Sequence, residues 1–521
     1  MAYTSVVATS WLDRCLGSGH PSDAGVLQID HTRQGRLSHC VSSDPDQPPF
    51  RQSVADQTAP RRPAKMEELK ISSSLEIFVA TAKFSSTLEI TYICTRISST
   101  LDMIESIRKY NFWDDSPIGL GYPRTFYTEK IGQYIDSQLI KVLVGQRRVG
   151  KSYILRQLAA QLIANGTPPN NILYINKEYL EFSDILDYQD LENLFQQYKK
   201  DLNPQGKVFL FIDEIQGIEE WERFVNSHAQ DYAEPCEVFI SGSNSSLLSG
   251  ELATLLSGRY VAFEILPFSF SEFCGITRRE TNKESYLDFL QTGALPELFN
   301  LPNDEMKQNY VSSIKDTVML HDIVARYKVK DVKLLDDLFV YLVNNASSII
   351  SITNIVNFFK SRNRKTNYET LSNYISYLES TFLVHKVERY NIKGKETISA
   401  NSKYYLNDLC YHNYLYSGFG YGMGYLLENA VYLSLRRAGY QVYVGTNKEA
   451  EVDFVAINGS RRLYFQVTLQ LTERKTIERE YRSLLSIEDN FEKYVVSLDD
   501  FKLPTNEGID HISAWELDTI L

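Results

Sequence analysis

Residues 142–158 read VLVGQRRVGKSYILRQL, and this stretch decides the fold. A short apolar run ends at Gly145, and apolar residues at helical spacing begin after Lys151. Between them the chain matches G-x-x-x-x-G-K-[ST] in full, from Gly145 to Ser152. A strand that leads through a glycine-rich loop into a helix is typical of phosphate-binding loops. The stretch therefore predicts an α/β fold that binds a nucleotide.

Each position of this loop has a physical role. Glycine lets the backbone wrap closely around an anion, and the unpaired N–H groups of the following helix point at phosphate. Lys151 would place a charge on the β- and γ-phosphates, and the Ser152 hydroxyl is a ligand for Mg²⁺. Arg147 and Arg148 add positive potential or face solvent. The residues expected to bind ATP are Gly145, Gln146, Arg147, Arg148, Val149, Gly150, Lys151, Ser152 and Tyr153.

A pair of carboxylates follows a second apolar run, VFLFIDE at 208–214. In an open parallel sheet ligands bind at the carboxyl ends of the strands, where this pair falls. Asp213 is expected to hold Mg²⁺, and Glu214 to orient or deprotonate the attacking water. The alternative is a plain acidic loop after a strand. The pair favours an ATPase that hydrolyses its nucleotide over a simple kinase.

Polar residues also end the next predicted strand, which reads CEVFISGSN over 236–244. Ser243 or Asn244 could reach the γ-phosphate and the water, and the sequence does not choose between them. Alternatively these side chains cap the next helix, a position that Ser and Asn favour.

Length and composition limit the class of protein. With 521 residues, the chain should contain several domains. No apolar run approaches the about 18 residues of a membrane span, so we expect no membrane contact. The six cysteines are scattered without a C-x-x-C pair, which argues against zinc and disulfides and favours a reducing, cytoplasmic location. The net charge of −12 does not indicate nucleic acid, although a basic patch remains compatible with it.

Strand and helix patterns alternate up to about residue 270, which predicts a parallel α/β layer. The pattern is then mostly helical to about 390, and strands return from 403. Residues 1–65 are rich in Ser, Asp, Gln, Pro and Arg and cannot form a packed core. We therefore expect residues 1–102 to form a poorly ordered extension.

Four stretches, GQRRVGKS, FLFIDEIQ, ISGSNSSLLSGELATLLSGRYVAFEILPFSFSEF and GALPELF, resemble a prokaryotic family of AAA-type P-loop ATPases. That family carries a C-terminal domain of unknown function. The resemblance implies an AAA+ core over 103–270, a helical lid over 271–325, a winged helix-turn-helix over 326–400 and a restriction-endonuclease-like α/β domain over 401–521. It also implies that Arg259 stabilises γ-phosphate charge, in its own subunit or in a neighbour; the alternative is a surface salt bridge.

The predicted winged helix is basic. Residues 326–396 carry twelve Lys and Arg against seven Asp and Glu. Arg362, Arg364 and Lys365 lie in a turn between two predicted helices, where they could neutralise DNA phosphates. Asn367, Tyr368 and Ser372 on the second helix could also meet DNA. Many winged helices instead dock proteins, so an unidentified protein partner is the alternative.

The C-terminal block has the spacing of an endonuclease-like core, with Glu428, Asp453 and Gln466 in the acidic positions. Gln466 replaces an acid, and Thr468 stands where a water-activating lysine is usual. We therefore predict an inactive fold that survives as a binding module, although Glu451 could substitute as a metal ligand.

Together these patterns predict an ATPase that couples binding and hydrolysis of Mg-ATP to conformational change in C-terminal DNA- or protein-binding modules. Two alternatives stay open. One is a slow nucleotide-dependent switch with little turnover, and the other is an ATP-gated nuclease, which Gln466 and Thr468 disfavour. A homo-oligomer is also compatible with the sequence.

Overall fold

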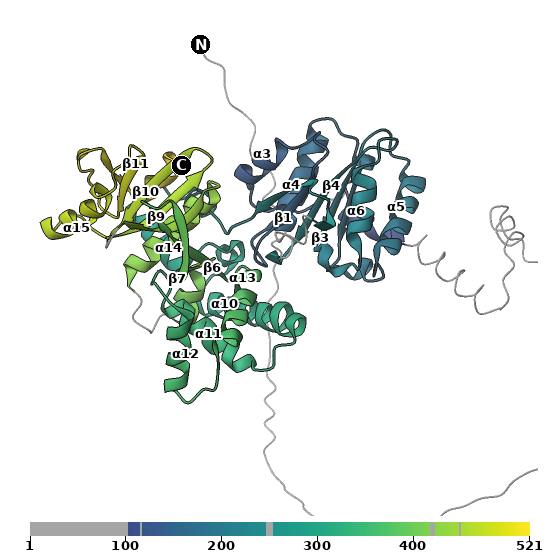
Figure 1. The fold of residues 1–521 in the computed structure, drawn as a ribbon. Coiled ribbons are helices and arrows are strands. Elements are labelled where there is room, and N and C mark those ends of the chain that lie inside the picture. Colours follow the sequence, from purple (N-terminus) through teal and green to yellow (C-terminus); the bar gives the residue numbers. More distant parts are fainter. Residues whose placement is uncertain (1–102, 115–116, 246–253, 417–421, 448–449) are drawn as a thin grey trace, which may run out of the picture. The chain divides into compact units, whose positions relative to one another are not determined.

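The computed structural model describes residues 103–114, 117–245, 254–416, 422–447 and 450–521 (Figure 1). The predicted N-terminal extension, residues 1–102, lies outside these residues. The described chain contains two β-sheets, each flanked by helices, with a helical stretch between them in the sequence.

The first sheet has five parallel strands in the order β2-β3-β4-β1-β5. The strands are β1 (Ile140–Val144), β2 (Ile172–Asn176), β3 (Val208–Asp213), β4 (Cys236–Gly242) and β5 (Tyr260–Glu264). Every residue of β1, β2 and β3 is buried, as their continuous apolar character predicts for a sheet that is covered on both faces. The parallel sheet expected from the sequence is therefore confirmed.

Helices cover the two faces of this sheet. They are α3 (Thr125–Gly132), α4 (Lys151–Ala164), α5 (Tyr188–Leu202) and α6 (Trp221–Ala229). Successive side chains of a strand point to opposite faces, so Leu143 packs in one cluster with Ile154 of α4. Val142 packs in a second cluster with Leu191 of α5 and with residues of α6.

A helical segment follows the sheet in the sequence. It comprises α8 (Phe270–Thr277), α9 (Lys283–Thr292), α10 (Asp304–Thr317), a π-helix (Val318–Ala325), α11 (Val332–Asn344), α12 (Ile352–Ser361) and α13 (Tyr368–Ser380). Leu338 of α11 and Ile375 of α13 belong to the same buried cluster as Leu143 and Ile154. The helices from α11 to α13 thus share one hydrophobic core with a face of the first sheet.

The second sheet has seven strands in the order β12-β11-β10-β9-β8-β6-β7. The strands are β6 (Val384–Asn391), β7 (Glu396–Leu406), β8 (Gln441–Asn447), β9 (Ala450–Asn458), β10 (Arg461–Val467), β11 (Glu492–Ser497) and β12 (Ile509–Ser513). The domain boundary that we expected between residues 400 and 401 falls inside β7. The reason is that the β6–β7 hairpin, which follows α13, continues directly into this sheet through β8.

Two helices cover the second sheet, α14 (Met423–Arg437) and α15 (Arg474–Leu485). Phe454 of β9 packs in a cluster with Leu427 of α14, whereas the next residue, Val455, packs in another with Leu484 of α15. Each helix therefore covers its own face. Among the described helices, none combines the length and the apolar composition needed to cross a bilayer.

Candidate nucleotide site

The predicted phosphate loop connects β1 to α4 at the carboxyl end of β1. A Cβ at Gly145 would overlap the carbonyl oxygen of Ile265, because the chain after β5 passes close by and bonds to Val144. Gly150 precedes α4 with φ 99°, a left-handed conformation that side chains disfavour. Both glycines of the motif are thus required sterically.

Lys151 is buried at the start of α4. Its ammonium group donates to the carbonyl oxygens of Gly145, at 2.9 Å, and Gln146, at 3.1 Å. It also lies 3.7 Å from a carboxylate oxygen of Glu214. The predicted phosphate-binding lysine is therefore held between its own loop and the acidic pair.

Asp213 ends β3 and is completely buried. One carboxylate oxygen accepts hydrogen bonds from the Tyr174 hydroxyl and the Asn176 amide, both at 2.9 Å, and the other accepts from the Ser241 hydroxyl. Burial, followed by the charge of Glu214, raises the Asp213 pKa, and a hydrogen bond from Ser152 opposes that rise. Ser152 and Asp213 thus meet, and both offer the hard oxygen atoms that Mg²⁺ prefers.

Glu214 has a left-handed backbone, with φ 54°, and its N–H donates to the Ser241 hydroxyl at 3.2 Å. The Gln216 side-chain amide donates to its carboxylate. Burial alone would raise the Glu214 pKa, but the charge of Lys151 and the Gln216 hydrogen bond outweigh it, so the pKa is lowered. Glu214 is therefore ionised near neutral pH.

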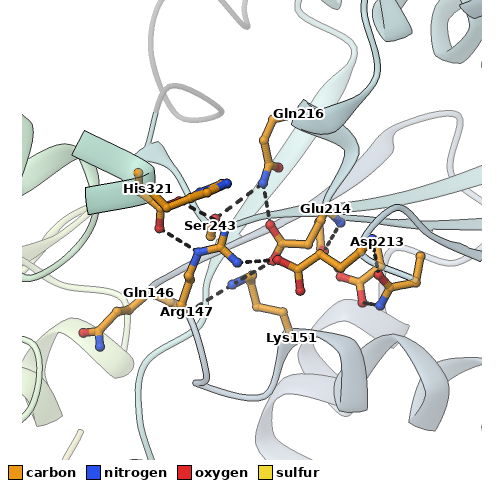
Figure 2. Close-up of polar contacts among 12 residues, drawn as sticks. Gln146, Arg147, Lys151, Asp213, Glu214, Gln216, Ser243 and His321 are labelled. Carbon is orange, nitrogen blue, oxygen red and sulfur yellow. Dashed lines mark hydrogen bonds and ion pairs between the residues drawn. The ribbon is translucent and has the colours of Figure 1, made fainter. Parts of the chain in front are cut away.

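Ser243 and Asn244 follow β4 and are buried. The Ser243 hydroxyl accepts from the Gln216 amide at 3.4 Å, which brings it beside Glu214 (Figure 2). Both residues line a cavity of about 500 Å³ together with Glu214 and Arg147. The polar ends of β3 and β4 therefore face one cavity. Any helix that Ser243 and Asn244 could cap by way of residues 246–253 lies outside the described residues.

The remaining loop residues have different surroundings. Arg147 forms an ion pair with both carboxylate oxygens of Asp322, at 2.7 and 3.0 Å, and another with Glu178, whereas Arg148 is exposed. Gln146 is buried and points away from the acidic pair (Figure 2). Tyr153 is partly exposed on α4, with the Arg156 guanidinium 4.3 Å above its ring.

Arg259 lies at the other edge of the sheet. It directly precedes β5, it is exposed, and its carbonyl oxygen accepts from the N–H of Ile140 at the start of β1. The phosphate loop follows the end of β1. A strand of five residues spans about 17 Å, so the structure does not bring Arg259 to the loop of its own chain.

Arg124 contacts the phosphate loop but carries no motif that would reveal it. This buried guanidinium donates to the carbonyl oxygens of Val149, at 2.8 Å, and Leu266, at 2.9 Å, and forms an ion pair with Glu272 at 2.6 Å. Arg124 therefore connects Val149 of the loop to Glu272 of α8 and fixes the position of the loop. The sequence motifs did not indicate four further residues that bond to the acidic pair: Tyr174, Asn176, Gln216 and Ser241. Asn176 could have been predicted from the sequence, because it is a polar residue at the end of the apolar strand β2. In the sheet it lies next to Asp213 at the end of β3.

The C-terminal carboxylates do come together. Glu428 of α14, with Glu451 and Asp453 of β9, surrounds the buried ammonium group of Lys403 from β7, at 3.0, 2.9 and 3.7 Å respectively. The Gln466 side-chain oxygen accepts from the N–H of Asp453 at 3.4 Å. A lysine therefore reaches this cluster from β7, a strand that was expected from the sequence but to which no site residue was assigned. Within the described residues, no group of His, Cys, Asp and Glu has an arrangement suited to a metal ion.

The three basic residues of the turn after α12 differ from one another. Arg364 forms an ion pair with Asp337 of α11 at 2.7 Å. The Arg362 guanidinium lies 4.1 Å above the Phe358 ring. Lys365 lines a cavity of about 620 Å³ that Lys328 and Lys330 also line.

Two family models match the chain. The model of an AAA domain matches residues 137–274, and that of a domain of unknown function, DUF8612, matches residues 283–419. The first contains the phosphate loop and the acidic pair, and the second contains α9 to α13 with the β6–β7 hairpin.

Two relatives align with most of their own length. An uncharacterized protein from Haemophilus influenzae is 34% identical over 400 residues, which make up 76% of this chain and 98% of that protein. Uncharacterized protein MJ1544 from Methanocaldococcus jannaschii is 32% identical over 359 residues, or 66% of this chain and 77% of that protein.

Solved structures are more distant. AMPPCP-bound DnaA from Aquifex aeolicus is 16% identical, with a TM-score of 0.27, over 52% of this chain and 93% of that chain. The Aeropyrum pernix ORC1 protein in complex with DNA is 11% identical, also with a TM-score of 0.27, over 56% of this chain and 92% of that chain. These scores are too low to transfer an activity or a partner.

Proposed function

Because this chain belongs to a family of proteins that join an AAA domain to the DUF8612 domain, we propose that it binds and hydrolyses Mg-ATP. Its output would be conformational change in the C-terminal part of the chain. The single observation that carries the proposal is the buried cluster of Lys151, Asp213 and Glu214 beside the phosphate loop.

Each residue of the cluster has a role in this reaction. Lys151 and the N–H groups at the start of α4 would bind the phosphates, which carry most of the charge of the substrate. Ser152 and Asp213 would hold Mg²⁺, whose bound charge offsets the negative charge on the transferred phosphoryl group. Glu214, which is ionised at neutral pH, would orient the attacking water and accept its proton. Ser243 or Asn244 would complete the water site.

Arg259 requires a second subunit in this proposal. It lies at the edge of the sheet opposite its own phosphate loop, so it could contact a γ-phosphate only in a neighbouring copy. An arginine supplied from another subunit is a known way to stabilise the transition state of phosphoryl transfer. ATP-dependent self-association is therefore part of the proposal.

The C-terminal output is DNA or protein binding. Three helices, α11 to α13, precede the β6–β7 hairpin, and Ile350 forms a lone bridge with Ser402 of β7. This order of elements supports a winged helix, and the lysines beside α13 support contact with phosphate. We propose that the carboxylate cluster around Lys403 does not cleave nucleic acid, since the ammonium group already occupies the space between the acids.

The experiment that tests the function is steady-state phosphate release with Mg²⁺, with and without duplex DNA. Lys151→Ala should lose ATP binding, whereas Glu214→Gln should retain bound ATP and lose turnover. Glu219→Gln, an exposed glutamate nearby, is the matched control and should hydrolyse ATP like the unmodified chain. Undiminished phosphate release by Glu214→Gln would remove that residue from its role. ATP binding with negligible turnover in the unmodified chain would favour the switch.

A further inference from the structure

The side chain of Gln146 leaves the phosphate loop in the direction opposite to the acidic pair (Figure 2). Its amide group contacts two residues that follow β7. The nitrogen bonds to the Tyr411 hydroxyl, and the oxygen accepts from the Asn407 amide at 2.8 Å. All three side chains are buried. The second residue of the phosphate loop is thus held by the segment that leaves the second sheet.

The same segment is fixed on its other sides. The carboxylate of Asp408 accepts hydrogen bonds from the backbone N–H groups of Ala294, at 2.9 Å, and Cys410, at 2.8 Å. Asn407 also bonds to the His385 ring at 2.9 Å. Because buried polar networks tolerate only arrangements in which each member keeps its partners, this segment should shift as a unit rather than residue by residue.

Lys403 begins the same stretch of chain. It lies on β7 four positions before Asn407, and its ammonium group holds the carboxylates of Glu428 and Glu451. Four residues of extended strand span about 13 Å. The short segment from Lys403 to Asn407 therefore contacts the C-terminal carboxylate cluster at its first residue and the phosphate loop at its last.

Phosphate binding would act on the first end of this connection through Lys151. The Lys151 ammonium group has three N–H donors and uses two of them on the carbonyl oxygens of Gly145 and Gln146, so a bound phosphate would compete with these oxygens for the ammonium group. A phosphate that draws the ammonium group away would leave the Gln146 carbonyl without this donor, which favours a change in the loop conformation at this residue.

We propose that Gln146 is a positioning residue that transmits the nucleotide state of the phosphate loop to residues 403–411, and through Lys403 to the carboxylate cluster. The proposal rests on the proposed binding of a nucleoside triphosphate. It adds the route by which a change in the loop would reach the second sheet, namely the contact of Gln146 with Asn407 and Tyr411. Residues 403–411 are the element that responds.

The test is hydrogen–deuterium exchange on the full chain, with Mg²⁺ and a non-hydrolysable ATP analogue. In the unmodified chain, saturating analogue should change exchange of the 403–411 backbone by at least threefold. Tyr411→Phe and Asn407→Leu should bind the analogue but lose most of that change. Tyr414→Phe removes a hydroxyl from the same helical turn outside this contact, and it should respond like the unmodified chain.

A separate titration with a fluorescent ATP analogue distinguishes the two failures. If the unmodified chain binds the analogue and exchange at 403–411 does not change, the route is wrong and the ATPase proposal stands. The route is also wrong if both contact variants respond fully. If the unmodified chain does not bind the analogue at all, both proposals are wrong. Since Tyr411→Phe removes only one oxygen atom, it keeps the test valid even if Asn407→Leu does not fold.

Discussion

The guanidinium group of Arg124 donates a hydrogen bond of 2.8 Å to the carbonyl oxygen of Val149, inside the phosphate loop. The same group bonds to Leu266 and pairs with Glu272, so one buried side chain ties the loop to the chain after β5 and to α8. The loop conformation therefore depends on a residue that lies before the first strand of the sheet.

Replacing Arg124 with Met should weaken both the fold and ATP binding. Removing one partner of a buried ion pair costs about 3 kcal/mol or more of unfolding free energy. The double variant Arg124→Met/Glu272→Leu should recover part of the stability, because it also removes the unpaired carboxylate, but it should not recover ATP affinity. Urea denaturation and titration with a fluorescent ATP analogue measure the two effects. Full recovery of affinity in the double variant would contradict a bracing role for Arg124.

Asp213→Asn should make the folded chain more stable and at the same time abolish ATP hydrolysis. Burial and the adjacent Glu214 raise the Asp213 pKa, so the ionised carboxylate is disfavoured in the folded chain. Without Mg²⁺, the neutral amide should raise the unfolding free energy at pH 8, because no charge is then buried at this position. Hydrolysis should fall to background, because the metal ligand is lost. Thermal unfolding in EDTA and phosphate release with Mg²⁺ measure the two results, and a less stable variant would argue against this account.

Glu379 of α13 should make stability depend on pH. Burial raises its pKa to about 7, and Lys386 only partly opposes that shift. The folded chain therefore favours the protonated carboxyl. This contribution to stability is complete below the unfolded pKa of about 4.3 and is lost as pH rises through about 7.

The matching variant is Glu379→Gln, which cannot ionise. Between pH 5 and pH 8 its unfolding free energy should gain about 2 to 3 kcal/mol relative to the unmodified chain. Glu369→Gln changes an exposed glutamate on the same helix and should show no such gain. Parallel pH curves for Glu379→Gln and the unmodified chain would refute the buried-carboxyl interpretation.

Lys403→Met should leave the carboxylates of the C-terminal cluster without their counter-ion. The variant should lose stability at pH 8 and recover much of it near pH 5, because burial raises the Asp453 pKa to about 7 and the acid then becomes protonated. Mn²⁺ should raise the melting temperature of this variant more than that of the unmodified chain. Plasmid cleavage by the unmodified chain that depends on Asp453 would show that the cluster is instead an active nuclease site.

The basic residues near α13 should differ in their effect on DNA. Lys365→Ala, combined with Lys328→Ala and Lys330→Ala, should weaken retention of duplex DNA at low salt, because each phosphate contact adds to affinity. Arg364→Ala should mainly reduce stability, since that guanidinium pairs with Asp337. Filter binding at several salt concentrations and thermal unfolding distinguish these outcomes. Equal DNA binding by the triple variant would reject this surface.

The sequence predicted the parts of the site that follow local rules. The glycines, lysine and serine after an apolar run predicted a loop between β1 and α4, and the structure brings Lys151 of this segment within 3.7 Å of Glu214 at the end of β3. The loop motif and the acidic pair each depend on residues a few positions apart. The strand alternation likewise predicted the parallel sheet.

Contacts between distant segments were not predictable in this way. Arg124 meets Val149, Gln146 meets Asn407, and Lys403 meets Glu428 only because the chain returns to the same place after many residues. The two residues of each pair stand at no characteristic spacing in the sequence, so no motif predicts their contact. The same limit applies to the boundary expected at residue 400, which falls inside β7: the pairing of β6 with both β7 and β8 joins the hairpin to the second sheet, and local sequence does not reveal it.

One buried cluster joins residues on both sides of Ala325, namely Leu143 and Ile154 with Leu338 and Ile375. A chain cut after Ala325 would separate Leu143 and Ile154 from Leu338 and Ile375, so each piece would expose to water part of a cluster that is buried in the whole chain. Neither fragment should survive cellular proteolysis for long. The helices α11 to α13 are therefore not expected to work as a module that could be moved alone into another protein.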